Sequence, residues 1–408
     1  MARSKGLGKF IRTYINLDGG IDVWFFAFLS VILVSGLILM YSASYVYAYQ
    51  KADGDSAYYF KRQLVWVIAG VVLMLLISRL NYKKFETIAA VVGTGASWFF
   101  LALALVMPAH NGTHRHIYLG PIQFQPSDVA KFALILTLAA MLDKYHEAVV
   151  SKKPLQSSLA RKVNSVAGKP LMNYSVRIIV ILGLIIAVYA GLVIAGSHLS
   201  GTILILAIGV IMLYLGEVRG KWFIFGALAA VALLILLWNT DLLKGYMQER
   251  IYAWQHKDYD PLGDRWQINQ ALYAIGSGGL FGKGIGQSTL KHLYVSEPQN
   301  DMIFSIIVEE IGFVGAALII LLFALLIWRG VVIGVNCPDR YGALVAMGIV
   351  FQVGVQVTLN ILVATDSIPN TGIPLPFFSY GGTAMLVNLA EMGFVLSISR
   401  HSRIQRRK

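Results

Sequence analysis

Tyr294–Gly312 reads YVSEPQNDMIFSIIVEEIG, a stretch that is polar as far as Asp301 and apolar afterwards. Two further carboxylates, Glu309 and Glu310, lie inside the apolar part. A charged side chain within a membrane-spanning helix costs about 2.5–3.5 kcal/mol on insertion scales, so it is by default a candidate functional residue. The stretch therefore predicts a membrane helix with Asp301 at its entrance and two carboxylates inside it.

The composition is typical of a polytopic membrane protein. Of the 408 residues, 57% are hydrophobic and only 13% are charged, and the mean hydropathy is +0.66. In a soluble chain the net charge of +13 would suggest nucleic-acid binding, but here the basic residues cluster between apolar runs. This distribution indicates membrane topology, and we expect no nucleic-acid partner. The single cysteine, Cys337, excludes an internal disulfide.

Ten apolar runs predict an all-α polytopic membrane protein with about ten transmembrane helices, as a single domain over residues 1–408. The predicted spans are 23–50, 64–78, 87–107, 126–142, 178–195, 199–216, 222–238, 302–328, 342–364 and 383–398. The short loops on the N-terminal side carry most of the lysines and arginines, which predicts that both termini are cytoplasmic. The basic loop at 144–177 is then cytoplasmic, and the long loop at about 239–300 lies outside, next to Asp301.

Asp301 has two interpretations at this stage. It could act as a general base or ion ligand at the membrane surface, or it could simply cap the following helix, where Asp is favoured. On a regular helix, Glu309 lies about 80° around the axis from Asp301, and Glu310 lies about 180° away. Glu309 could therefore share a cavity with Asp301. The alternative is that both glutamates are structural polar bridges between helices.

Asp128 and Lys131 are three residues apart in the fourth predicted span, so they share one helix face. A lysine inside a membrane span requires an acidic partner. Lys131 could pair with Asp128, or it could face Asp301 across a cavity and keep that carboxylate ionised. Both arrangements can hold together.

Arg115 lies in the loop that follows the third predicted span. A cation beside an outer cavity suits a phosphate or pyrophosphate. His110, His114 and His116 flank it, and H-x-H could bind a metal. Because no acid in the loop completes a ligand set, we expect solvated histidines and no metal site here.

The stretch 370–383, NTGIPLPFFSYGGT, contains two prolines and three glycines that interrupt an apolar sequence before the last span. Irregular backbone at membrane depth is tolerated where it lines a cavity or is buried in protein. The stretch either borders a site or forms a re-entrant turn without chemistry.

Three stretches together resemble the SEDS family (shape, elongation, division and sporulation), whose members include RodA, FtsW and SpoVE. They are Asn111–Lys131 with its Gln-Pro-Ser-Asp-x-x-Lys ending, Gly263–Gly312, and Gly372–Thr383, GIPLPFFSYGGT. Their order, their spacing and the ten-span layout match the family over essentially the whole chain. The sequence PQND before the eighth span resembles that of the division and sporulation branch, FtsW or SpoVE, rather than that of RodA.

The resemblance implies a peptidoglycan glycosyltransferase that polymerises lipid II at the outer face of the bacterial cytoplasmic membrane. It implies that Asp301 is the general base on the acceptor's GlcNAc 4-hydroxyl, with undecaprenyl pyrophosphate as the leaving group. The expected substrate-binding or orienting residues are Lys131, Asp128, Arg115, Glu309 and Ser379. A divalent cation, Mg²⁺ or Mn²⁺, could assist the pyrophosphate, although the sequence shows no ligand set. The expected partners are a class B penicillin-binding protein, which is a transpeptidase, and other membrane proteins of the division or elongation machinery.

The chain departs from the family pattern at two places. Many members carry Pro-Asp-Leu-Gly-Thr between spans five and six, whereas Ser197–Thr202 reads SHLSGT and has no acid. Any role of that aspartate cannot be transferred to this chain. Many members also have His-Thr-Asp where this chain has Gln299-Asn300-Asp301, so the aspartate is kept and the histidine is not.

Two functions of other classes compete with the enzyme. A lipid II flippase would also need intramembrane charges and broken helices. A non-catalytic scaffold for a transpeptidase would need neither. The acids and the broken backbone concentrate at the predicted outer side, which favours an enzyme over a transporter that needs polar groups along the whole path.

Overall fold

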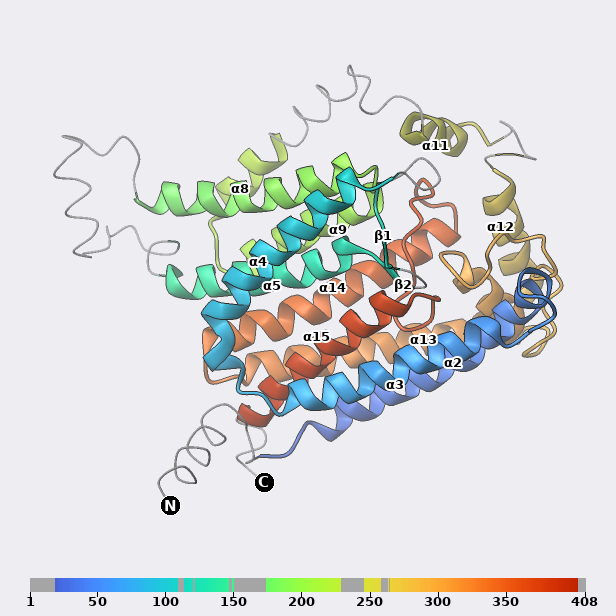
Figure 1. The fold of residues 1–408 in the computed structure, drawn as a ribbon, viewed down its shortest axis with the longest axis horizontal. Coiled ribbons are helices and arrows are strands. Elements are labelled where there is room, and N and C mark those ends of the chain that lie inside the picture. Colours follow the sequence, from blue (N-terminus) through green and yellow to red (C-terminus); the bar gives the residue numbers. More distant parts are fainter. Residues whose placement is uncertain are drawn as a thin grey trace.

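The computed structural model describes residues 19–108, 114–119, 122–146, 149, 174–228, 246–257, 263 and 265–402. Long helices dominate these ranges and lie roughly alongside one another (Figure 1). They are α2 (Val23–Lys51), α3 (Tyr58–Ser78), α4 (Tyr82–Val106), α5 (Pro126–Lys144), α8 (Tyr174–Ala195), α9 (Leu199–Leu215), α13 (Ile303–Val335), α14 (Arg340–Ala364) and α15 (Gly382–His401).

The prediction of an all-α polytopic membrane protein is confirmed. Among the described residues, seven helices are long and apolar enough to cross a membrane, namely α2, α3, α4, α8, α13, α14 and α15. The predicted fourth and sixth spans appear as α5, which carries four charged residues, and as α9, which is short. The predicted seventh span is helical at 220–228, and its remainder lies outside the described residues, as does most of the 144–177 loop.

The helices α5 and α14 form the interior of the bundle. α14 packs against α13, α5, α9 and α15, and α5 packs against α4, α9 and α14. Both bury more than half of their residues. Large apolar side chains on α2, α3, α4 and α13 are instead exposed, as expected for helices that face lipid. Polar residues on α5 and α14 therefore lie inside protein rather than in lipid.

Both ends of the described chain meet at one end of the bundle. Asp22 caps α2 by accepting a hydrogen bond from the Phe25 amide at 3.0 Å, and it pairs with Arg329 of α13 at 2.7 Å. Arg400 of α15 donates to the main-chain oxygen of Gly19 at 2.6 Å. Arg329, which follows the predicted boundary at 328, is neutralised by this pair, and α13 continues past it to Val335.

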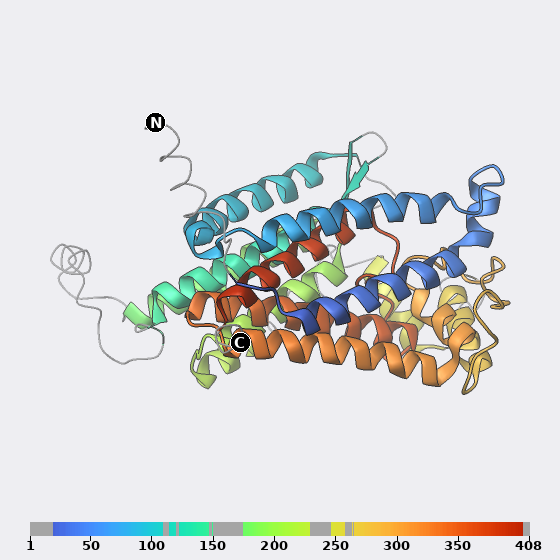
Figure 2. The same cartoon turned by 90° about the horizontal axis from the view of Figure 1, so that it is seen from below.

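The opposite end of the bundle, called here the Asp301 end, carries short helices and a hairpin within the predicted loops. The predicted loop between spans three and four contains an antiparallel hairpin of β1 (Ile117–Leu119) and β2 (Ile122–Phe124). The predicted loop at 239–300 contains α11 (Tyr246–Gln255) and α12 (Trp266–Gly278), and α12 packs on α13. Figure 2 shows these elements gathered at the same end as the turn between α2 and α3.

Candidate active site

Asp301 lies in a turn directly before α13, and it is half-buried. The helix cap is Met302 and makes no side-chain capping bond, so the capping interpretation of Asp301 does not hold in this structure. The Asp301 carboxylate faces Gly372, where a Cβ atom would lie 3.6 Å from Oδ2. The turn therefore brings the acid against the irregular stretch 370–380.

The stretch 370–380 is tied to the Asp301 turn along its length. The Ser379 hydroxyl donates to the main-chain oxygen of Asn300 at 2.7 Å and accepts from the Leu375 amide at 2.8 Å. The amide of Tyr380 donates to the oxygen of Gln299 at 2.8 Å. Ser379 is therefore brought next to Asp301, where its hydroxyl fixes the backbone of the turn. The stretch borders the site and is not an isolated re-entrant turn.

Three amide side chains on α14 connect this region to the interior. Gln352, Gln356 and Asn360 are four residues apart, so they share one face of the helix. The Asn360 amide donates to the oxygens of Asp301 at 2.8 Å and Ile373 at 2.7 Å. Sequence reasoning missed this stripe, although amides at i, i+4 and i+8 in an apolar helix are a detectable signal.

The predicted ion pair within α5 is confirmed. Lys131 Nζ lies 2.9 Å from Asp128 Oδ1, and both side chains are buried. Lys131 also donates to Gln356 at 3.3 Å, while Gln356 donates to the oxygen of Pro374 at 3.0 Å. Lys131 therefore reaches the 370–380 stretch through one amide, and no direct bond to Asp301 is found in the described part of the chain.

A basic recess lies on one side of the Asp301 turn. Arg115 and Arg250 line it, together with His198, Ser200 and Thr371, and it has a volume of about 20 Å³. That volume suits one water molecule or a single oxygen of an anionic group. Thr371 Oγ1 and Arg115 Nε are buried and find no hydrogen-bond partner among the described residues.

The two arginines act on Asp301 electrostatically. Burial raises the pKa of Asp301, whereas the positive charges of Arg250 and Arg115 lower it. Burial, followed by the charges of Arg115 and Lys131, lowers the pKa of His198 to about 3, so the imidazole is neutral. His198 lies in the SHLSGT stretch where many family members have an aspartate, and here that place carries a neutral ring rather than an acid.

Glu309 does not share a cavity with Asp301. Its carboxylate pairs with Lys283 at 2.7 Å and accepts hydrogen bonds from Ser288 and from the amide of Thr289. The angular prediction assumed a regular helix through Asp301, whereas α13 begins at Ile303. Glu309 therefore holds the loop that follows α12.

Glu310 forms the second structural bridge, as the alternative interpretation expected. It pairs with Lys291 at 2.5 Å and accepts from the Ser42 hydroxyl of α2 at 2.6 Å. Lys291 is fully buried, and its ammonium group lies 4.7 Å from the centre of the Tyr45 ring. The lysines that pair with Glu309 and Glu310 could not be chosen from the sequence, because several loop cations were available.

A break in α13 explains how the loop after α12 packs against this helix. Gly312 has φ 70° and ψ −175°, which interrupts the helical hydrogen-bond ladder. Main-chain groups of the preceding loop replace the lost partners, as buried backbone requires. The replacement bonds are Lys283 N to Glu309 O and Gly284 N to Glu310 O, both 2.9 Å, and Phe313 N to Gly279 O and Val314 N to Leu280 O, at 2.9 and 3.0 Å.

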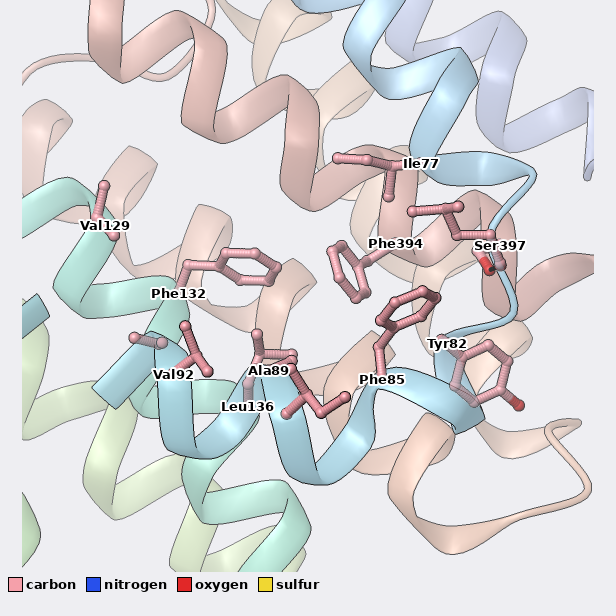
Figure 3. Close-up of a pocket in the computed structure, with 14 residues that line it drawn as sticks. Ile77, Tyr82, Phe85, Ala89, Val92, Val129, Phe132, Leu136, Phe394 and Ser397 are labelled. Carbon is pink, nitrogen blue, oxygen red and sulfur yellow. Dashed lines mark hydrogen bonds between the residues drawn. The ribbon is translucent and has the colours of Figure 1, made fainter. Parts of the chain in front are cut away.

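A second recess lies away from Asp301 and is apolar. Its volume is about 310 Å³, and its walls come from the C-terminal end of α3, from α4, α5 and α15. Figure 3 shows Phe85 of α4, Phe132 of α5 and Phe394 of α15 lining this space. It offers contact area for hydrocarbon but no group for acid–base chemistry.

The donor set near Asp301 does not fit a resident divalent cation. Within the described ranges, no group of three His, Cys, Asp or Glu side chains comes together. The charged groups that act on Asp301 include two arginines, which repel a cation. Of the loop histidines, His114 bonds the oxygen of Met107 at 2.8 Å, and His110 lies outside the described residues.

Residues 22–404 match the family model described as a cell cycle protein, FtsW/RodA/SpoVE. The chain belongs to this family. The family predicted from the three sequence stretches is therefore confirmed, and the match covers the whole helix bundle.

Curated relatives and solved structures agree with this membership. The chain is 35% identical to stage V sporulation protein E of Bacillus subtilis (strain 168), over 91% of this chain and 95% of the relative. It is 32% identical to the probable peptidoglycan glycosyltransferase FtsW of Coxiella burnetii, over 93% and 96%. The crystal structure of the rod shape determining protein RodA of Thermus thermophilus aligns with a TM-score of 0.63 at 26% identity, covering 94% of this chain and 98% of RodA.

A second solved structure comes from work titled as the structural coordination of polymerization and crosslinking by a peptidoglycan synthase complex. It aligns with a TM-score of 0.70 at 26% identity, over 93% of this chain and 98% of that chain. Relatives named stage V sporulation protein E and FtsW are thus 30–35% identical to this chain.

Proposed function

We propose that this chain is a peptidoglycan glycosyltransferase that polymerises lipid II, with Asp301 as the general base. The observation that carries the proposal is the placement of Asp301. Its carboxylate faces Gly372 of the irregular stretch and is influenced by Arg115 and Arg250, while the turn itself is anchored through the Asn360 amide. A fixed acid beside a cationic recess is the arrangement that glycosyl transfer from a diphosphate requires.

The proposed reaction needs a base on the acceptor side and a leaving group on the donor side. Asp301 accepts the proton of the acceptor's GlcNAc 4-hydroxyl as that oxygen attacks the anomeric carbon of the donor's MurNAc. The bond from that carbon to the pyrophosphate oxygen breaks, and undecaprenyl pyrophosphate leaves with the bonding electrons. Attack opposite the leaving group converts the α-linkage into a β-1,4 bond, and the proton stays on Asp301 until solvent removes it.

Arg115 and Arg250 are the groups we assign to the departing pyrophosphate. Guanidinium groups match phosphate oxygens in pairs of hydrogen bonds and stay charged at every relevant pH. Arg250 is held by a 2.7 Å bond to the oxygen of Asn370, which positions it in the recess with Arg115. The neutral His198 leaves the recess without a competing anion.

Lys131 and Asp128 are assigned an orienting role. Their ion pair is connected through Gln356 to the oxygen of Pro374, within the stretch that borders Asp301. Ser379 orients the Asp301 turn from the other end of that stretch. Glu309 is assigned an indirect role, because it holds the loop after α12 rather than the Asp301 turn.

We place the chain in the bacterial cytoplasmic membrane with the Asp301 end outside. The positive-inside distribution supports this orientation, and the meeting of Gly19 with Arg400 supports termini on one side. A class B penicillin-binding protein is the proposed partner, in keeping with the peptidoglycan synthase complex that the chain resembles. Other division or elongation proteins belong to the same proposal.

The deciding experiment compares the parent chain with Asp301→Asn, with and without a cognate transpeptidase, on labelled lipid II. We expect glycan strands from the parent chain and a loss of about 10²–10⁴-fold in the variant, the range typical of a removed general base. Equal polymerisation by both would refute the assignment of Asp301. If neither polymerises but lipid II crosses liposome bilayers, the transporter hypothesis replaces the enzyme, and a chain that only recruits its partner is a scaffold.

A further inference from the structure

The Asp301 turn has a second flank, opposite in character to the arginine recess. The stretch 370–380 borders both flanks: Asn370 and Thr371 line the recess, whereas Tyr380 bonds the Asp301 turn at Gln299. Figure 1 shows α11, which carries Arg250, and the ends of α2 and α3 on different sides of this end of the bundle. The second flank is therefore formed by the α2–α3 turn.

Aromatic rings dominate this second flank. The rings of Tyr59 and Tyr380 meet edge to face with centroids 4.9 Å apart, and Tyr47 lies 6.1 Å from Tyr59. Arg62 lies 4.4 Å from the centre of the Tyr58 ring, and its guanidinium also acts electrostatically on the Tyr380 side chain. These tyrosines are half-buried, and Arg62 is exposed, so the group keeps one accessible side.

An exposed carboxylate acts electrostatically on both the rings and Asp301. Glu297 lies four residues before Asp301 and interacts electrostatically with Tyr47, Tyr59 and Asp301. Its φ of 46° is unusual for a residue with a side chain, and Asn300 holds its carboxylate at 2.7 Å. Strained non-glycine backbone of this kind clusters at functional sites.

Two simpler explanations account for only part of this arrangement. Tyrosine belts at a membrane interface are common, and Tyr49, which is 62% exposed, fits one. A belt does not explain why one of these rings belongs to Tyr380, whose main-chain amide bonds the Asp301 turn at Gln299. Packing alone does not explain why a guanidinium lies over one of the rings while a carboxylate on a strained backbone acts electrostatically on two others.

This combination suits an amino sugar. The negative face of an aromatic ring attracts the C–H face of a pyranose, and a carboxylate accepts hydrogen bonds from hydroxyl and acetamido groups. A guanidinium donates to hydroxyl and carbonyl oxygens. A few polar groups around an aromatic platform are the usual way in which a site fixes the orientation of a ligand.

We propose that Tyr59, Tyr380 and Glu297 form a saccharide subsite that holds the acceptor's N-acetylated disaccharide beside Asp301. This inference rests on the proposed glycosyl transfer and adds a direction to it. The acceptor sugar lies on the tyrosine flank, the donor's pyrophosphate lies on the arginine flank, and Asp301 stands between them. Arg62 lies at the rim, where it reaches the acceptor's oxygens.

The test measures saccharide binding without turnover. The full chain in lipid nanodiscs is titrated with a soluble, peptide-free GlcNAc–MurNAc tetrasaccharide, which has no pyrophosphate and cannot react. We expect saturable binding by the parent chain and a Kd about tenfold weaker or more in Tyr59→Ala, Tyr380→Ala and Glu297→Gln. Tyr59→Phe keeps the ring and should bind as the parent does, and Tyr49→Ala is the matched control.

The outcomes separate this inference from the proposed function. Absence of saturable binding by the parent chain overturns the subsite, as do unchanged Kd values in the alanine variants or an equal loss in Tyr49→Ala. Polymerisation of lipid II by the parent chain is measured separately and can succeed when the subsite fails. Thermal unfolding of each variant checks folding, and Glu297→Gln at an exposed position tests the subsite even if an alanine variant is unstable.

Discussion

The Asn360 side-chain amide donates to the main-chain oxygen of Asp301 at 2.8 Å, and thereby connects the middle of the bundle to the turn that carries the proposed base. Asn360 is completely buried, and its second bond, at 2.7 Å, holds Ile373 of the facing stretch. One side chain thus fixes the separation between the two segments that enclose the Asp301 carboxylate.

Replacing Asn360 by Asp should lower kcat while lipid II binding is kept. The change conserves volume but removes both donors, and an unsatisfied buried group costs about 1–3 kcal/mol, or about tenfold to a hundredfold in rate. Steady-state polymerisation kinetics measure the effect. Thr358→Val, on an exposed face of the same helix, is the control, and an equal fall in both variants would contradict the assignment.

Arg250→Gln should move the acidic limb of the pH–rate profile to higher pH. Asp301 works as a base only when ionised, so activity is present above its pKa and is lost as the pH falls through it. Burial raises this pKa and the Arg250 charge lowers it, so removing the charge raises it further. The profile of kcat/KM measures the shift, with the exposed Lys61→Gln as control; a shift to lower pH would contradict the electrostatic argument.

Lys131→Met should destabilise the fold more than the double variant Asp128→Asn/Lys131→Met. Removal of one partner leaves a buried charge unpaired, which costs about 3–5 kcal/mol, whereas removal of both charges avoids that cost. Thermal unfolding in detergent, arranged as a double-mutant cycle, measures the difference. Equal losses in the single and double variants would show that the pair contributes through something other than charge compensation.

Gly312→Ala should prevent the loop after α12 from seating on α13. A Cβ atom there would lie 2.5 Å from the Leu280 oxygen, at a φ of 70° that side chains disfavour. We expect a lower unfolding temperature together with loss of activity. Gly183→Ala, where a Cβ meets nothing within 4 Å, is the matched control and should leave both unchanged.

The sequence determined the class of protein and pointed to part of the proposed site. Long apolar runs predict membrane helices whatever their packing, because lipid excludes backbone groups that lack a hydrogen-bond partner. The three family stretches pointed to Asp301, Lys131 and Asp128, and the spacing of three residues placed Asp128 and Lys131 on one helix face, where their pairing was one of two arrangements considered.

Only the tertiary structure decided which partner each polar group has. Glu309 and Glu310 are adjacent in the sequence, yet they hold Lys283 and Lys291 through a loop that replaces the hydrogen bonds broken at Gly312. Asn360 reaches Asp301 across 59 positions of sequence. Periodicity describes a regular helix and its own faces; it carries no information about a helix break or about a side chain that bonds main-chain atoms of a distant segment.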